Sequence, residues 1–225
     1  MDSKKSKLYS DAYKNIKSKG PYRFGPLSSE KLRVDPQYVM FQMSRYKHAA
    51  RLLSNKNSIL DIGPGDGIGL PILCSYFDNV TAVDIDQHML DNSQNFLDDE
   101  YKCNFILNDF SMNPLPNKFD SAVAFDVLSL IPPEIEKYWF QNICKSLEKD
   151  GIFLVGTQNK NIQHLGNPLN HVDQPNFKDF DQLNSLFSEF FENVLILSMN
   201  DETIHSGKRE TAQYFLAIGV APIEA

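Results

Sequence analysis

The sequence predicts an α/β domain built on a mostly parallel β-sheet with helices on both faces, and two observations support this fold class. Short apolar segments typical of buried strands alternate with amphipathic segments that have helical spacing. Parallel strands need crossover connections of this kind, which place helices over both faces of the sheet. The 225 residues are enough for one such domain to bury a large core.

The expected elements follow an N-terminal arm or lid, residues 1–35, which lacks a sustained apolar period and is interrupted by glycine and proline. Within this arm a short helix is expected near residues 9–17. Residues 36–225 are interpreted as one domain, beginning with an amphipathic helix over 36–53. The last two strands lack a full helix between them, which allows an antiparallel hairpin at one edge. The expected strands are 58–62, 80–83, 105–107, 121–125, 152–156, 194–198 and 212–218, and the further helices are 67–76, 88–97, 133–147 and 180–190.

Composition and charge argue against several classes of protein. The 22 Lys and Arg residues against 29 Asp and Glu give a net charge of −7, so neither a nucleic-acid partner nor a polybasic membrane anchor is expected. Cys74, Cys103 and Cys144 are odd in number and far apart in the sequence, which predicts buried thiols in a reducing compartment. No signal peptide or long apolar segment is recognised, so we expect a cytoplasmic protein without a membrane partner.

The most informative segment is a glycine-rich turn between a predicted buried strand and a helix. Residues 58–70 read Ser-Ile-Leu-Asp-Ile-Gly-Pro-Gly-Asp-Gly-Ile-Gly-Leu, with glycine at Gly63, Gly65, Gly67 and Gly69. Glycine permits a tight turn and the close approach of a ligand. A dinucleotide fingerprint, G-x-G-x-x-G, would need glycine where Ile68 stands. Asp61 and Asp66 would repel a pyrophosphate and suit an ammonium group, so the turn favours S-adenosylmethionine (SAM) over NAD.

Two further acidic positions follow the next two predicted strands. Asp84 lies about 20 residues beyond the turn, where a carboxylate can accept both ribose hydroxyls of an adenosine. Alternatively it caps the following helix, a role for which Asp86 is the better candidate. In the segment Asn108-Asp109-Phe110, the acid could accept from an adenine amino group while Phe110 packs near the ring; the alternative is a solvated turn.

Together these segments resemble the class I SAM-dependent methyltransferases. The other segments that carry the resemblance are 82–86, 119–128 and 147–153, in the family's order and within residues 36–200. The resemblance implies a Rossmann-like, doubly wound, seven-stranded sheet, mostly parallel with an antiparallel edge strand, and SAM across the strand tips. The cofactor-binding residues that it implies are Arg45, Asp61, Gly63, Gly65, Asp84, Ile85, Asn108, Asp109, Phe110 and Asp126, the last beside the methyl group.

The resemblance extends to a narrower group, the bacterial small-molecule and sugar methyltransferases of the surface-polysaccharide type, through Ser44–Lys47 and Ser198–Gly207. Many relatives read Asp-Val-(Ile/Leu)-Glu-His-(Ile/Leu)-Pro after the fourth strand. Here the segment is Asp126-Val127-Leu128-Ser129-Leu130-Ile131-Pro132, so the Glu-His pair cannot supply a base. The (Asp/Asn)-Pro-Pro-(Tyr/Phe) and Pro-Cys motifs of DNA-modifying relatives are missing as well, which argues against nucleic-acid bases as acceptors.

The candidate catalytic residues are His171, His205 and Asp126. The two histidines lie in polar loops, 158–178 and 199–211, which the resemblance places on the acceptor side. An imidazole with a pKa of about 6.5 could take a hydroxyl proton, although His171 could equally serve only to hold its loop. Arg45 could pair with the methionine carboxylate or be an ordinary surface residue. The five histidines form no HxH or HxxxH pair, so no metal site is expected.

The sequence therefore predicts transfer of a methyl group from SAM to a small-molecule acceptor, at an oxygen of a sugar or related metabolite. Two alternatives remain open. Loss of the Glu-His pair allows a catalytically silent SAM-binding protein that acts through a partner. An NAD-type Rossmann oxidoreductase is disfavoured by Ile68 and by the carboxylates of the turn. The sequence specifies neither the acceptor nor the oligomeric state.

Overall fold

The computed structural model describes residues 3–165 and 176–223, with side chains over 9–162 and 176–223. One sheet of eight strands has the order β3-β2-β1-β4-β5-β8-β6-β7. The strands are β1 (Ser58–Ile62), β2 (Asn79–Asp84), β3 (Cys103–Leu107), β4 (Phe119–Phe125), β5 (Leu147–Gln158), β6 (Phe191–Asn200), β7 (Thr203–His205) and β8 (Tyr214–Pro222). The helices are α1 (Ser3–Lys19), α2 (Pro26–Val34), α3 (Pro36–Leu52), α4 (Leu70–Cys74), α5 (Gln87–Phe96), α6 (Pro133–Lys145) and α7 (Phe180–Ser188).

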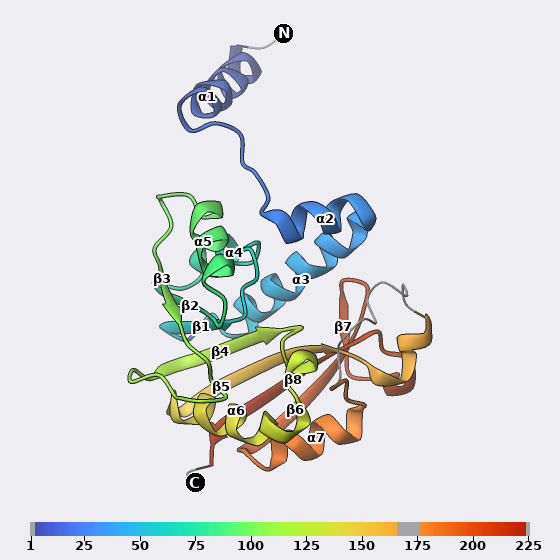
Figure 1. Ribbon diagram of the computed structural model, residues 1–225. Coiled ribbons are helices and arrows are strands. Elements are labelled where there is room, and N and C mark those ends of the chain that lie inside the picture. Colours follow the sequence, from blue (N-terminus) through green and yellow to red (C-terminus); the bar gives the residue numbers. More distant parts are fainter. Residues whose placement is uncertain (1–2, 166–175, 224–225) are drawn as a thin grey trace.

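The sheet topology confirms the predicted fold class. Strands β1 to β5 pair in parallel, and β8 pairs antiparallel with both β5 and β6. Helices α3, α4 and α5 lie on one side of the sheet and α6 and α7 on the other (Figure 1). The eighth strand, β7, was not expected because it is short and lies within the polar loop 199–211. The strand order reverses at β1, so the carboxyl ends of β1, β2 and β4 border the crevice where α/β sheets bind ligands.

Two hydrophobic clusters cover the two faces of the sheet. Aromatic side chains dominate the first, where Trp139 and Phe140 of α6 pack against Phe153 of β5 and Phe187 of α7. The second joins α3 and α4 to the other face and includes Tyr46, Ala49, Leu70 and Leu73. Burial on both faces explains why the central strands read as nearly continuous apolar segments.

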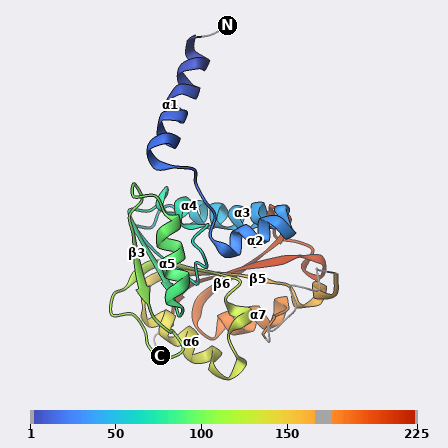
Figure 2. The ribbon, with the colours of Figure 1, turned by 45° about the horizontal axis from the view of Figure 1, so that its top comes forward.

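The N-terminal arm contains two helices: α1, which includes the short helix expected over residues 9–17, and α2, which the weak apolar period did not predict. Helix α1 stands away from the body of the protein, as Figure 2 shows, with Tyr9 and Tyr13 exposed. Helix α2 packs against α3, whose start is fixed by the Asp35 carboxylate accepting from the Gln37 N–H at 3.1 Å. Among the described residues, none of the helices combines the length and the apolar character needed to cross a bilayer.

Candidate active site

The glycine-rich turn connects β1 to α4 at the carboxyl edge of the sheet. Gly63, Gly65 and Gly67 have φ angles of +70°, +62° and +84°, which residues with side chains rarely adopt. The Gly63 N–H donates to the Val83 carbonyl of β2 at 2.8 Å. A Cβ on Gly63 would collide with the side chain of Val127, just beyond β4. The turn therefore brings the ends of β1, β2 and β4 close together.

Asp61 lies in β1 directly before this turn, and its side chain is fully buried. Its Oδ1 accepts a 3.4 Å hydrogen bond from the Tyr46 hydroxyl, whereas its Oδ2 has no hydrogen-bond partner within the described part of the chain. Burial raises the pKa of this carboxyl to about 8, because the charged form loses its solvation. A buried polar atom without a partner is costly, so this oxygen fits a cationic ligand such as the ammonium group expected at the turn.

Asp66 has a protein partner in place of the cationic ligand that the sequence suggested. Its Oδ2 accepts from the Ser28 N–H at 2.7 Å and its Oδ1 from the Ser28 hydroxyl at 2.6 Å. Ser28 lies in the first turn of α2, where backbone N–H groups need acceptors from outside the helix. Asp66 therefore attaches α2 to the glycine turn. Both oxygens are already used, which corrects the expectation that Asp66 serves an ammonium group.

Asp84 lies at the carboxyl end of β2, and its Oδ1 accepts from the Asp86 N–H at 3.0 Å. Desolvation by burial raises the pKa of Asp84. Asp86 caps α5 by accepting from the His88 N–H at 2.8 Å, which confirms that it is the better cap. Ile85 is 72% exposed. Asp84 is thus free of the capping role, and Ile85 beside it is accessible to a ligand.

The segment after β3 agrees only in part with the predicted adenine contacts. The Asn108 N–H donates to the Asp84 carbonyl at 3.1 Å, which joins the ends of β3 and β2. Asp109 is exposed, and its Oδ1 accepts from the Ser111 N–H at 2.8 Å. The Phe110 side chain is buried in the core on the α6 face. Its ring is therefore unavailable to an adenine, and the prediction for Phe110 is wrong.

Asp126 lies directly after β4 and is the centre of a polar cluster. Its φ angle is +61°, a strained conformation for a residue with a side chain. The Oδ2 atom accepts from Arg45 Nη1 at 2.7 Å and from the Tyr38 hydroxyl at 3.1 Å, and Oδ1 accepts from the Tyr214 hydroxyl at 2.9 Å. The neighbouring carboxylate raises the pKa of Tyr38 to about 12, so this hydroxyl remains a donor at neutral pH. Helix α3 and strands β4 and β8 therefore meet at one carboxylate.

Arg45 is 1% exposed and pairs with Asp126, a residue that the sequence did not indicate as its partner. Its guanidinium carbon lies 4.7 Å from the ring centroid of Phe41 and 4.4 Å from that of Tyr214. The Nε and Nη2 atoms have no hydrogen-bond partner in the described structure. Two buried donors are thus left for a ligand, which keeps the predicted contact with a methionine carboxylate as a proposal.

Tyr38 and Tyr214 are functional candidates that sequence reasoning missed. Tyr38 precedes Arg45 by two helical turns on α3, so their shared helix face was a usable signal. Tyr214 begins the last strand and contacts a carboxylate 88 residues earlier in the chain, for which no local pattern exists.

Of the two candidate histidines, the structure describes only His205. His171 lies outside the described residues. His205 is in β7, where its Nε2 hydrogen-bonds to Oδ1 of Asn200 at 2.8 Å. Strands β5, β8 and β6 lie between β4 and β7 in the sheet, and no hydrogen bond of the described structure joins His205 to Asp126. Its position therefore does not support the predicted role as the base beside the methyl group.

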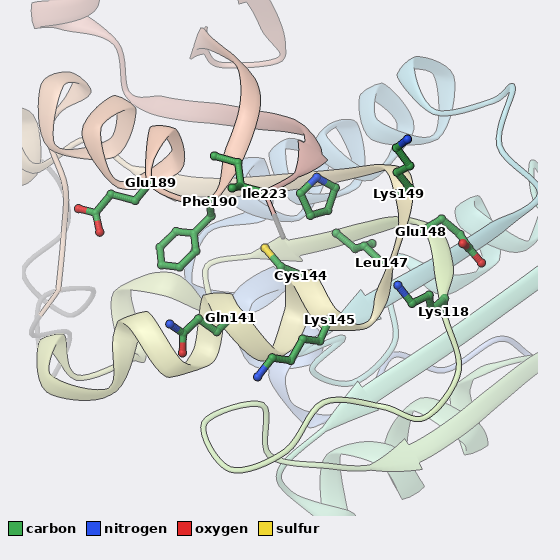
Figure 3. Close-up of a pocket in the computed structure, with 11 residues that line it drawn as sticks. Lys118, Gln141, Cys144, Lys145, Leu147, Glu148, Lys149, Glu189, Phe190 and Ile223 are labelled. Atoms are coloured by element: carbon green, nitrogen blue, oxygen red, sulfur yellow. The ribbon is translucent and has the colours of Figure 1, made fainter. Parts of the chain in front are cut away.

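A separate hollow of about 440 Å³ lies at the other end of the central strands, where β4 and β5 begin (Figure 3). It is lined by the end of α6, the first residues of β5 and the last described residues of the chain. These segments lie where β4 and β5 begin, whereas the glycine turn and Asp126 lie where β1 and β4 end. The hollow is thus distinct from the candidate site.

Comparison with known protein families finds a match for the part of the chain that contains the glycine turn. A family model described as a methyltransferase domain matches residues 60–155, which run from β1 into β5. Residues 60–155 thus match a methyltransferase domain, in agreement with the resemblance to the class I SAM-dependent methyltransferases. The match implies SAM as the cofactor. No curated protein matches the sequence.

Solved structures share the methyltransferase fold at low sequence identity. N-methyltransferase NodS from Bradyrhizobium japonicum WM9, in complex with S-adenosyl-L-homocysteine (SAH), has a TM-score of 0.61 and 17% identity over 81% of this chain and 88% of its own. The plantazolicin methyltransferase BpumL, in complex with a desmethylPZN analogue and SAH, has a TM-score of 0.64 and 16% identity, over 86% of this chain and 88% of its own. A possible histamine N-methyltransferase from Thermotoga maritima has a TM-score of 0.64 and 15% identity, over 85% of this chain and 93% of its own.

The described residues of the methyltransferase domain suit SAM chemically. The partnerless carboxylate oxygen of Asp61 and the partnerless nitrogens of Arg45 match the ammonium and carboxylate of an amino acid. The glycines that follow Asp61 allow the backbone of the turn to approach a ligand closely. Among the described side chains, no group of three or more His, Cys, Asp or Glu could hold a metal ion.

Proposed function

We propose that this protein transfers a methyl group from SAM to a small-molecule acceptor at the edge formed by the glycine turn, Asp84 and Asp126. The observation that supports a small acceptor is that helices α2 and α3 lie over this edge; we call these two helices the cover. Ser28 of α2 binds Asp66 of the turn, and Tyr38 and Arg45 of α3 bind Asp126. A cofactor edge covered by the chain's own helices suits an acceptor that enters a pocket better than one on the surface of a polymer.

The contribution of the protein is to align the reactants. SAM supplies a methyl group activated by a positively charged sulfur. In this proposal Asp61 binds the ammonium group, Arg45 binds the carboxylate through Nε and Nη2, and Asp84 binds the ribose. The cluster at Asp126 holds α3 in place over the edge and excludes water from it. Proximity and orientation of the acceptor then account for most of the rate.

The acceptor class that we propose is a hydroxyl oxygen of a sugar or related metabolite. Hydroxyl and carboxylate groups converge at the methyl-transfer edge, namely those of Tyr38, Tyr214 and Asp126, and such groups suit a polyhydroxylated ligand. A hydroxyl acceptor must lose its proton, and His171 remains the sequence-based prediction for that base.

A nitrogen acceptor is the second candidate. Three donors already occupy the Asp126 carboxylate, and an uncharged amine needs no base to attack a methyl group. Two of the solved structures with the same fold, NodS and the Thermotoga maritima protein, carry N-methyltransferase names. The similarity to those proteins shows the fold alone, so their acceptors enter only as compounds to test.

The direct test is a methylation screen with methyl-labelled SAM and two matched panels, one of sugars and hydroxylated metabolites and one of small amines. Label on a hydroxyl oxygen would support the first acceptor class, and label on nitrogen would replace it with the second. Calorimetric titration with SAH and with NAD accompanies the screen. Binding of NAD without binding of SAH would contradict the proposal, as would SAH binding without methyl transfer to either panel.

A further inference from the structure

Two of the three cysteines lie near each other at the start of strand β3. Cys74 is the last residue of α4 and Cys103 is the first residue of β3. The Cys74 thiol donates a 3.6 Å hydrogen bond to the Lys102 carbonyl, which belongs to the peptide bond leading into Cys103. The Cys103 thiol donates to the Asn104 carbonyl at 3.5 Å, and both cysteines pack against the same hydrophobic cluster. The sequence predicted three buried thiols, whereas in the structure all three are partly exposed and Cys74 lies beside the peptide bond that leads into Cys103.

We propose that Cys74 and Cys103 form a disulfide when the protein meets a peroxide, so that the pair is an oxidation-sensitive modification site. A disulfide requires two side chains that already lie close together, and partial exposure admits a small oxidant. Strand β3 is at the edge of the sheet, so Cys103 can move toward Cys74 without disturbing a second neighbouring strand. The inference does not depend on which acceptor the enzyme methylates.

The chemistry balances with hydrogen peroxide as the oxidant. The Cys74 thiolate attacks one peroxide oxygen, the O–O bond breaks, and a sulfenic acid and one water form after protonation. The Cys103 thiol then attacks the sulfenic sulfur, the S–S bond forms, and a second water leaves with the sulfenic oxygen. The two thiols lose two electrons in total, and the peroxide gains them.

The two thiols are not equivalent, which sets the order of these steps. The interaction between the two thiols lowers the pKa of Cys74 and raises the pKa of Cys103. Because the thiolate is the reactive form, Cys74 reacts with the peroxide and Cys103 resolves the sulfenic acid.

Cys144 is an internal control. It lies in α6 and faces the hollow of Figure 3, whose lining contains no other cysteine. Burial raises its pKa to about 12, so it is almost entirely a thiol at neutral pH. Cys144 is therefore expected to stay reduced under conditions that oxidise the pair.

The test treats the full chain with a small excess of hydrogen peroxide, removes the excess, and counts free thiols after denaturation. The count is expected to fall from three to one, and peptide mapping should find the peptides of Cys74 and Cys103 joined. Reduction with dithiothreitol should restore all three. The Cys144→Ser variant should behave like the parent in forming the pair.

The variants Cys74→Ser and Cys103→Ser separate the two roles. Cys103→Ser should accumulate sulfenic acid at Cys74, detected with dimedone, whereas Cys74→Ser should react much more slowly. Circular dichroism verifies that each variant is folded. A joined peptide that contains Cys144, or loss of thiols without a Cys74–Cys103 crosslink in the folded parent, would overturn the proposal.

Discussion

Asp61 and Asp126 end neighbouring parallel strands at the same edge of the sheet, yet their surroundings are opposite. Asp61 is fully buried with one oxygen that no described group reaches. Asp126 is partly exposed and accepts three hydrogen bonds, from Arg45, Tyr38 and Tyr214. The comparison teaches that the two acids have different tasks. In our proposal, Asp61 binds a cationic group of the cofactor, and Asp126 holds helix α3 over the site.

Arg45→Met should have the largest effect, because it removes the charged partner of Asp126 together with the contacts to the surrounding rings. We expect the free energy of unfolding to fall by about 3 kcal/mol, measured by urea denaturation at pH 7. Arg51→Met is the matched control on the same helix, since Arg51 is exposed, and it should change stability by less than about 0.5 kcal/mol. Equal stability of the two variants would contradict the role given to Asp126.

Asp61→Asn should weaken cofactor binding with little loss of stability. The amide keeps the shape of the carboxylate but loses the charge that an ammonium group requires. We expect the SAH dissociation constant to rise about 10- to 100-fold in calorimetric titrations, as for a charged hydrogen bond of about 1.5–3 kcal/mol. Asp99→Asn, at an exposed acid, should leave the constant within about a factor of two. If both variants bind SAH equally, Asp61 is not a cofactor ligand.

Ser28→Ala tests the attachment of α2 to the glycine turn. The variant removes one of two donors to the buried Asp66 and should cost about 1–2 kcal/mol of stability. Its SAH dissociation rate, followed by stopped-flow fluorescence, should increase because the cover opens more readily. Ser29→Ala is the neighbouring control, because that hydroxyl donates only to the Phe24 carbonyl. The same dissociation rate in both variants would argue against the attachment.

The two tyrosines at Asp126 should give the smallest and most discriminating effects. Tyr214→Phe removes a fully buried hydroxyl and should cost about 1 kcal/mol. Tyr38→Phe removes a hydroxyl at a half-buried residue and should cost about 0.5 kcal/mol. Urea denaturation of the two variants side by side measures the difference, and the reverse ranking would contradict the arrangement at Asp126.

Local patterns made the backbone of the glycine turn and the cap of α5 predictable. The glycines of the turn, the acid at the end of β2 and the cap at Asp86 each depend on residues that are close in sequence. The rest depends on contacts between distant segments. Ser28 and Asp66 are 38 residues apart, and Tyr38 and Asp126 are 88 residues apart. Neither pair leaves a periodic signal. Phe110 was misplaced because a strand-end position does not reveal which face its ring occupies.

The raised pKa of Asp61 also affects stability. The folded protein retains a proton on this carboxyl up to a pH of about 8, whereas the unfolded chain loses it near its ordinary value of 3.8. The unfolded state therefore binds fewer protons between these values, so stability contributed by Asp61 falls as the pH rises from about 4 to about 8. Asp61→Asn should remove this slope, which urea denaturation at a series of pH values would show.

Proton release on SAH binding at pH 7 tests the central claim most directly. The claim is that Asp61 is protonated in the free protein and must ionise to bind the ammonium group of the cofactor. Calorimetric titrations in buffers with different ionisation enthalpies give the number of protons exchanged, and Asp61→Asn corrects for ionisation of SAH itself. The parent should release close to one proton more than Asp61→Asn. Equal proton exchange in the two proteins would contradict the account.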